Sequence, residues 1–332
     1  MRPYAFRRLP MEKSMKQNIL IFLMMFTVLL SGSSSYAEGE VTATYLYHLS
    51  NFAGTVPYQL PHVRVDNTNH EIFVSSSTGI KIYNYSGMEI YDFNRQYYLL
   101  NQFNIDFAVD EEGWIFFLTV HYNPVTGNKT NSLGRRNYMM VPVESIALTG
   151  LPSELINVAP SRLVYHQGFL YLGDLDGMQI IVIDKKGRYQ KHYDLKVALP
   201  ENSDKEDWGM SDFFVDRDGS ILFTAPVIGS AYRVSPDGAI AVISRRGSGR
   251  GKLGIPSSII ADAKGNYLVA DKLKSSIIMF NKDFQCIAEF GFRGPNPENI
   301  TGPTTLAIDD RNRLYVSQLA FKGVSVFQLP DI

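Results

Sequence analysis

The chain has 332 residues and a formal net charge of −1, with 45% hydrophobic and 20% charged residues. This balance is typical of a globular protein, and the near-neutral charge argues against a nucleic-acid partner or an anionic membrane surface. The single cysteine, Cys286, excludes an internal disulfide, and its strand-like surroundings, QCIAEF, predict a buried small hydrophobe.

The first 37 residues have the pattern of a secretory signal peptide. A basic start leads into a dozen mostly apolar residues, followed by a small-x-small cleavage site that ends at Ala37. The apolar run is shorter than the roughly 20 residues of a membrane span. We therefore predict a signal peptide over residues 1–37, with a true start at Met1, Met11 or Met15. The mature protein is then secreted or periplasmic, with no membrane span after cleavage.

Six later segments share one pattern, which is a short apolar run that ends in Asp or His, then a turn, then a second apolar run. Their anchors lie 44 to 56 residues apart and are Asp66, Asp110, His166, Asp216, Asp262 and Asp309. Such a period suits a four-stranded propeller blade. Because the acids recur beside a turn in almost every repeat, we interpret them as determinants of the fold.

Further β-rich runs complete each repeat. A third strand is predicted at IKIYN in the first repeat and at YMMVPV in the second, and a fourth often follows a Gly-bearing turn. The last repeat has only three strands, whereas an unattached strand, residues 43–52, precedes the first repeat. We predict an all-β fold with one domain over residues 38–332. It is a six-bladed β-propeller of four-stranded antiparallel blades, closed by the N-terminal strand pairing with the last blade.

Several segments resemble the NHL-repeat propellers, whose blades begin Pro-x-Gly-Ile-Ala-Val-Asp and end Phe-Gly-x-x-Gly. The matching segments are PSSIIADAKGNYLVAD, AEFGFRG, PTTLAIDDRNRLYVS and SRRGSGRGKLGIP. The resemblance implies a propeller fold. It implies no single activity, because such propellers serve as protein-binding, nucleic-acid-binding or enzymatic platforms.

In a propeller the first strand of each blade lines the central channel, so the residues four before each anchor should surround one mouth of it. We call these six residues the mouth ring: His62, Asp106, Arg162, Asp212, Ser258 and Thr305. NHL propellers usually have a small residue there, whereas four of these six are ionisable. Convergent polar groups at a concave mouth are typical of a ligand site. The two Asp could hold a cation and Arg162 a carboxylate. Alternatively, a water-filled channel simply tolerates charges that neutralise each other.

The resemblance also implies two metal-dependent alternatives. Amidating-lyase propellers bind zinc through channel-facing histidines, and here only His62 and His121 are placed for that role. Gluconolactonase-like propellers hold calcium, for which Asp106 and Asp212 could begin a site. The sequence has no G-x-S-x-G elbow and no Walker loop. We expect no cofactor, with zinc or calcium left as open alternatives.

The second repeat carries an insertion, residues 121–137, which we expect to be a polar loop. Long loops on rigid scaffolds often contact partners, and the basic residues here are Lys129, Arg135 and Arg136. The sequence favours an exported binding or scaffold module, a monomer or part of a larger complex. Its partner would be a protein, peptide or small-molecule ligand, recognised at the channel mouth. The alternative is a metal-dependent enzyme of the amidating-lyase or gluconolactonase type at the same mouth.

Overall fold

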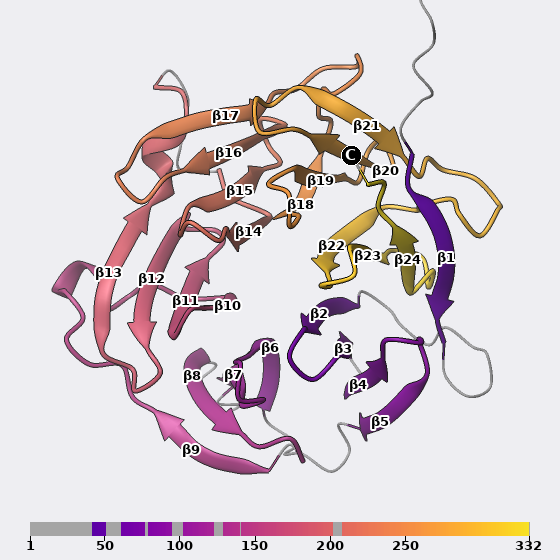
Figure 1. The fold of residues 1–332 in the computed structure, drawn as a ribbon. Coiled ribbons are helices and arrows are strands. Elements are labelled where there is room, and N and C mark those ends of the chain that lie inside the picture. Colours follow the sequence, from indigo (N-terminus) through magenta and orange to yellow (C-terminus); the bar gives the residue numbers. More distant parts are fainter. Residues whose placement is uncertain are drawn as a thin grey trace, which may run out of the picture. The chain divides into compact units, whose positions relative to one another are not determined.

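The computed structural model describes residues 42–50, 61–76, 79–94, 102–122, 129–139, 141–201 and 208–331. These residues form six four-stranded antiparallel sheets, arranged as blades around a common centre (Figure 1). The predicted six-bladed β-propeller is therefore confirmed. The predicted signal peptide, residues 1–37, lies outside the described residues.

The strands run outward from the centre in each blade. Blade 1 contains β2 (His62–Asp66), β3 (Glu71–Ser76), β4 (Gly79–Asn84) and β5 (Glu89–Asn94). Blade 2 contains β6 (Gln102–Val109), β7 (Ile115–Tyr122), β8 (Lys129–Arg136) and β9 (Pro142–Ile146). Blade 3 contains β10 (Arg162–His166), β11 (Phe169–Asp174), β12 (Gln179–Asp184) and β13 (Tyr189–Asp194). Blade 4 contains β14 (Asp212–Val215), β15 (Ile221–Ala225), β16 (Ser230–Val234) and β17 (Ile240–Ser244). Blade 5 contains β18 (Pro256–Ala261), β19 (Tyr267–Asp271), β20 (Ser276–Phe280) and β21 (Cys286–Phe290). Blade 6 contains β22 (Pro303–Ile308), β23 (Arg313–Gln318) and β24 (Val324–Gln328).

The N-terminal strand closes the ring. β1 (Thr44–Leu49) pairs antiparallel with β24, from Thr44 opposite Gln328 to Leu49 opposite Val324. It becomes the outermost strand of blade 6, which is the predicted closure, although it is shorter than the predicted 43–52. The pairing covers the edge that β24 would otherwise expose, and it joins the two ends of the propeller sequence in one sheet.

Apolar side chains pack between neighbouring blades. One cluster joins Ile180 of blade 3 to Phe223 of blade 4, and another joins Val63 of blade 1 to Val326 of blade 6. All four side chains are fully buried. Burying a side chain of this kind contributes about 1.5–3 kcal/mol, so the contacts between blades make a large contribution to the stability of the ring.

The acidic anchors stabilise the turns that follow them. The carboxylates of Asp66, Asp110, Asp262 and Asp309 each accept hydrogen bonds from backbone N–H groups of the next turn, at 2.8–3.1 Å. In blade 4 two acids share this role: Asp216 accepts from Arg217 N at 2.7 Å, and Asp218 accepts from Ser220 N at 2.9 Å. These contacts support the interpretation of the anchors as fold determinants.

Blade 2 differs from the prediction. The inserted residues lengthen the hairpin of β7 and β8, which pair from Ile115 opposite Arg136 to Tyr122 opposite Lys129. The prediction of a loop was therefore wrong for residues 129–136, which form a strand. The polar run KTNSLGRR can form this strand because the hydrogen bonds between the two strands of a hairpin join backbone groups and do not require apolar side chains. The segment YMMVPV is not the third strand, since Tyr138 and Met139 lie in the turn after β8 and Pro142 begins β9.

Two further features concern the described residues as a whole. Their helices are two short 3₁₀ turns, η2 (Ser153–Leu155) and η3 (Leu195–Ala198), and none is long and apolar enough to cross a membrane. Cys286 is half-buried on β21 and packs against an apolar core cluster, so the predicted buried small hydrophobe holds only in part. The reason is that β21 is the outermost strand of its blade and borders a groove.

Candidate functional site

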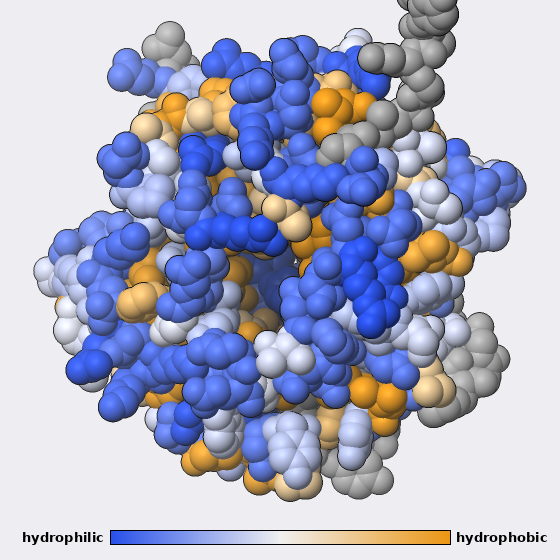
Figure 2. Space-filling view, in the orientation of Figure 1, coloured by the Kyte–Doolittle hydropathy of each residue, from blue (hydrophilic) through white to orange (hydrophobic). Residues whose placement is uncertain are grey.

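The six innermost strands bring the mouth ring together. β2, β6, β10, β14, β18 and β22 are the first strands of their blades and surround the centre (Figure 1). Each carries its mouth-ring residue within the strand or at its first position. Figure 2 shows a hollow in the middle of the ring, with mostly hydrophilic residues around it.

Arg162 connects four of the blades. Its Nη1 lies 2.7 Å from Nδ1 of His62 in blade 1 and 3.7 Å from Oδ2 of Asp106 in blade 2, and its Nε lies 3.1 Å from Oδ1 of Asp212 in blade 4. Blades 1 and 3 are not neighbours in the ring, so the Arg162 side chain reaches across the channel. The structure thus brings together all four ionisable residues of the mouth ring.

Of the other two members, Ser258 joins this network, whereas Thr305 bonds to a different side chain. Ser258 Oγ donates to Oδ2 of Asp212 at 2.5 Å, and Thr305 Oγ1 bonds to Oγ of Ser317. Three mouth-ring side chains also accept a hydrogen bond from a backbone N–H group of the next blade. In each case the donor is the residue directly after that blade's own mouth-ring residue. These pairs are Asp106 Oδ2 with Leu163 N (2.9 Å), Ser258 Oγ with Leu306 N (3.1 Å) and Thr305 Oγ1 with Val63 N (3.4 Å). The ring therefore also holds neighbouring inner strands together.

The charges in the ring depend on one another. Burial alone would raise the pKa of Asp106, which is 2% exposed, but Arg64 and Arg162 outweigh it and hold the pKa below its ordinary value. Burial and the positive charge of Arg162 lower the pKa of His62 to about 3. His62 is therefore neutral at physiological pH, and its Nδ1 accepts the hydrogen bond from Arg162.

Two cations at this mouth were missed in the sequence. Arg64 lies two residues after His62, and its Nη2 is 2.9 Å from Oδ2 of Asp106. Side chains two apart on a strand share a face, and the other five blades have an apolar residue at this position, so the period-two pattern could have revealed Arg64.

Lys272 is the second missed cation. It follows β19 directly, and its backbone N–H donates to Ile255 O at 2.9 Å. Lys272 is half-buried, and among the described residues its ammonium has no ion-pair partner. Burial, and next the charge of Arg162, lower its pKa. The preceding residue, Asp271, is fully buried and accepts from Gly254 N at 2.6 Å, which explains the acid there as a structural residue.

Two of the three basic residues predicted as partner contacts in blade 2, Arg135 and Arg136, make contacts within their own blade. The Arg135 guanidinium lies 4.4 Å from the ring centroid of Trp114 and 3.4 Å from a carboxylate oxygen of Glu144. That of Arg136 lies 5.1 Å from the ring centroid of Phe117. Lys129 begins β8. A partner contact at these three residues stays a prediction.

The histidines whose side chains the structure describes belong to several blades rather than to one cluster. The side chain of His121, predicted to face the mouth, lies outside the described part of the structure. His48 bonds to Ser325 Oγ at 2.9 Å and His192 to the Tyr189 hydroxyl at 2.9 Å, each on an outer strand. Within the part of the chain that the structure describes, no group of three or more His, Cys, Asp or Glu side chains could hold a metal ion.

Solved structures confirm the fold, whereas no protein-family model and no curated protein matches the sequence. A streptogramin B lyase structure aligns with a TM-score of 0.55 and 12% identity, covering 87% of this chain and 97% of the lyase. A Bacteroides thetaiotaomicron protein of unknown function gives 0.55 and 11% over 88% of this chain and 77% of its own. An auxiliary nutrient binding protein from Bacteroides thetaiotaomicron gives 0.55 and 10% over 86% and 75%. At these identities the similarity shows a shared β-propeller fold.

Proposed function

We propose that this protein is an exported binding module that recognises a carboxylate group of a protein, peptide or small ligand at the mouth ring. Export rests on the signal-peptide pattern of residues 1–37. The NHL-repeat family is proposed on the blade motifs. One solved propeller of the same fold is described as a nutrient binding protein, which is compatible with such a role.

The observation that carries the proposal is the ammonium of Lys272, which forms no ion pair among the described residues and lies near enough to Arg162 for that charge to lower its pKa. Arg64, Arg162 and Lys272 supply three positive charges at this mouth, against the carboxylates of Asp106 and Asp212. Both carboxylates are already paired with guanidinium groups, and His62 is neutral. One positive charge is therefore left over, which favours an anion over the cation considered from the sequence. A carboxylate suits this geometry because Arg and Lys both form charge-assisted hydrogen bonds with it.

The test is a thermal-unfolding titration with acetate, succinate and citrate at low ionic strength. A ligand that binds the folded state raises the melting temperature with its concentration. We expect at least one carboxylate to do so, and Lys272→Met to abolish the increase. Lys186→Met, an exposed lysine of blade 3, is the matched control and should respond as the wild type does. A panel without effect on the wild type, or an unchanged response of Lys272→Met, would reject the proposal.

A metal-dependent enzyme at the same mouth is the second candidate, and one observation favours it. Oδ1 of Asp106 is buried without a hydrogen-bond partner among the described residues, and such an oxygen could ligate a cation. Metal analysis of the purified protein tests this candidate. Zinc or calcium in a one-to-one ratio, lost in Asp106→Asn, would support it over the binding module.

A further inference from the structure

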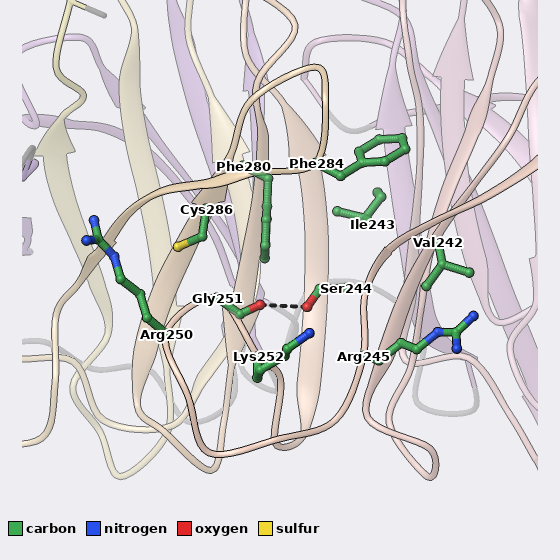
Figure 3. A pocket seen from close by; sticks show the side chains of 10 residues that line it. All are labelled: Val242, Ile243, Ser244, Arg245, Arg250, Gly251, Lys252, Phe280, Phe284 and Cys286. Atoms are coloured by element: carbon green, nitrogen blue, oxygen red, sulfur yellow. Dashed lines mark hydrogen bonds between the residues drawn. The ribbon is translucent and has the colours of Figure 1, made fainter.

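A groove of about 460 Å³ lies between blades 4 and 5, at the outer strands rather than at the channel mouth (Figure 3). β17 of blade 4 forms one wall, β20 and β21 of blade 5 form the other, and the linker between the blades completes it. The lining residues are Val242, Ile243, Ser244, Arg245, Arg250, Gly251, Lys252, Phe280, Phe284 and Cys286.

The linker that borders the groove is held by its own hydrogen bonds. Gly247 N donates to Leu253 O at 3.0 Å, and Leu253 N donates to Arg245 O at 3.0 Å. Ser244 Oγ donates to Gly251 O at 2.6 Å, as the dashed line in Figure 3 shows. Gly251 has φ +71°, and a Cβ built on it would lie 2.5 Å from Cβ of Cys286. The linker is thus packed directly against β21, and the groove is a built feature of the blade junction.

Three cations border the groove, and none of the ten lining residues is acidic. Among the described residues, Arg245, Arg250 and Lys252 form no ion pair. In Figure 3 the two arginines lie at opposite sides, with Lys252 and the Phe280 ring between them. The acid beside the groove, Glu289, is already 3.2 Å from the ammonium of Lys274. The groove therefore has a positive potential that is not neutralised locally.

The remaining lining is largely apolar. Ile243 and Phe280 are buried, and Phe284 is half-buried and packs against Tyr267 with ring centroids 5.6 Å apart. The Cys286 thiol adds a further weakly polar group and is half-buried. An apolar floor below several cations offers two kinds of contact to one ligand, burial of hydrocarbon and pairing of an anionic group.

We propose that this groove binds an amphipathic organic anion, that is, an aromatic or acyl group that carries a carboxylate, sulfonate or phosphate. The apolar part packs on the half-buried side chains of Val242 and Phe284, and the anionic group pairs with Lys252 and one of the two arginines. The volume fits a small ligand, since most small-molecule sites measure roughly 300–1,000 Å³. This site is separate from the mouth ring, and its test is independent of the proposed function.

Cys286 provides a local reporter for the test because it is the only cysteine in the chain. The probe is anilinonaphthalene sulfonate, an aromatic anion whose fluorescence rises in apolar surroundings. Fluorescence titration of the folded protein measures its affinity, and mass spectrometry measures the rate at which iodoacetamide alkylates Cys286. We expect a saturating probe to slow the alkylation at least about threefold, because the ligand covers part of the groove in which the half-buried thiol lies.

The double variant Arg250→Gln, Lys252→Gln tests the role of the charges. We expect it to bind the probe about tenfold more weakly, as the loss of one or two charge-assisted hydrogen bonds predicts, and to lose the protection of Cys286. Lys186→Gln, Lys191→Gln removes the same charge from blade 3 and should behave as the wild type. Phenylnaphthylamine, which lacks the sulfonate, should bind more weakly to the wild type and equally to both variants.

Two results would overturn the proposal. One is an alkylation rate of Cys286 that is the same with and without saturating probe, since the probe would then bind elsewhere. The other is equal affinity of the probe for both double variants, since the cations would then play no part. Circular dichroism establishes that each variant is folded, and the single exposed substitution Arg245→Gln replaces the double variant if that one does not fold.

Discussion

Nη1 of Arg162 lies 2.7 Å from Nδ1 of His62, and this contact joins the first strands of blades 3 and 1 across the channel. The Arg162 guanidinium also faces Asp106 and Asp212, so a single side chain links four blades at one mouth. Because the three partners come from separate blades, any change in the spacing of the inner strands would alter the network. The mouth ring therefore couples a candidate binding site to the closure of the propeller.

Arg162→Met should be strongly destabilising. The substitution leaves Asp212 buried with Ser258 as its remaining partner, and it removes one of the two guanidinium groups from Asp106. Removing one member of a buried ion pair costs about 3–5 kcal/mol, because the remaining charge stays desolvated. Urea denaturation measures the loss in free energy of unfolding.

The control for this prediction is the double variant Arg162→Met, Asp212→Asn. It removes the carboxylate that the first substitution leaves uncompensated, so it should regain part of the lost stability. If Arg162→Met alone were as stable as the wild type, the network would not contribute to the ring, and the side chain would have to be mobile in the channel.

His62 should make the stability of the protein depend on pH. The pKa of His62 is lowered from 6.5 to about 3 on folding, by burial and then by Arg162. Between these values the unfolded chain binds a proton that the folded chain does not, so acid favours unfolding. The contribution of neutral His62 is fully present above pH 6.5 and is lost as the pH falls toward 3.

The variant His62→Asn should remove this part of the pH dependence. Urea midpoints at about pH 7.5 and about pH 4.5 should differ less in the variant than in the wild type, because the variant has no group that titrates in this window at the site. His192→Asn, on the exposed outer strand β13, is the control and should keep the wild-type difference. Equal pH dependence in all three proteins would contradict the buried, neutral state of His62.

The fold was predictable because its signals are local. Most of the Asp anchors, such as Asp262, lie beside their own turn and bond to backbone groups within four residues, so they recur as a readable pattern. The unattached strand before the first repeat predicted the closure by β1, because the last repeat lacked one strand. The polar strand β8 escaped prediction because its pairing with β7, not its own composition, determines its structure.

The site was only half predictable for a related reason. The position of the mouth ring follows from the repeat, so counting back from the anchors found Arg162 and its partners. Whether these side chains contact one another depends on the width of the channel and on the length of the Arg162 side chain. The repeat pattern gives no information on either distance. Lys272 lies outside the repeat pattern, just beyond a strand end, and only the three-dimensional structure relates it to Arg162.

Gly251→Ala should destabilise the junction of blades 4 and 5 more than a glycine substitution elsewhere. Gly251 has φ +71°, and its new Cβ would lie 2.5 Å from Cβ of Cys286. Gly238 has φ +87°, and a Cβ added there would have nothing within 4 Å, so Gly238→Ala carries the backbone strain alone, about 1–2 kcal/mol. The steric clash at Gly251 should add about 1–3 kcal/mol.

The identity of the clashing atom makes this last prediction specific. Because the contact involves Cβ of Cys286, Cys286→Ala keeps that atom and should not rescue Gly251→Ala, whereas Cys286→Gly removes it and should. A double-mutant cycle with urea denaturation separates the two cases, since only contacting residues show a coupling energy. If Gly251→Ala and Gly238→Ala had equal costs, the linker would be able to move away from β21. The groove beside Cys286 would then be an adjustable opening, and the alkylation rate of the thiol should rise in Gly251→Ala.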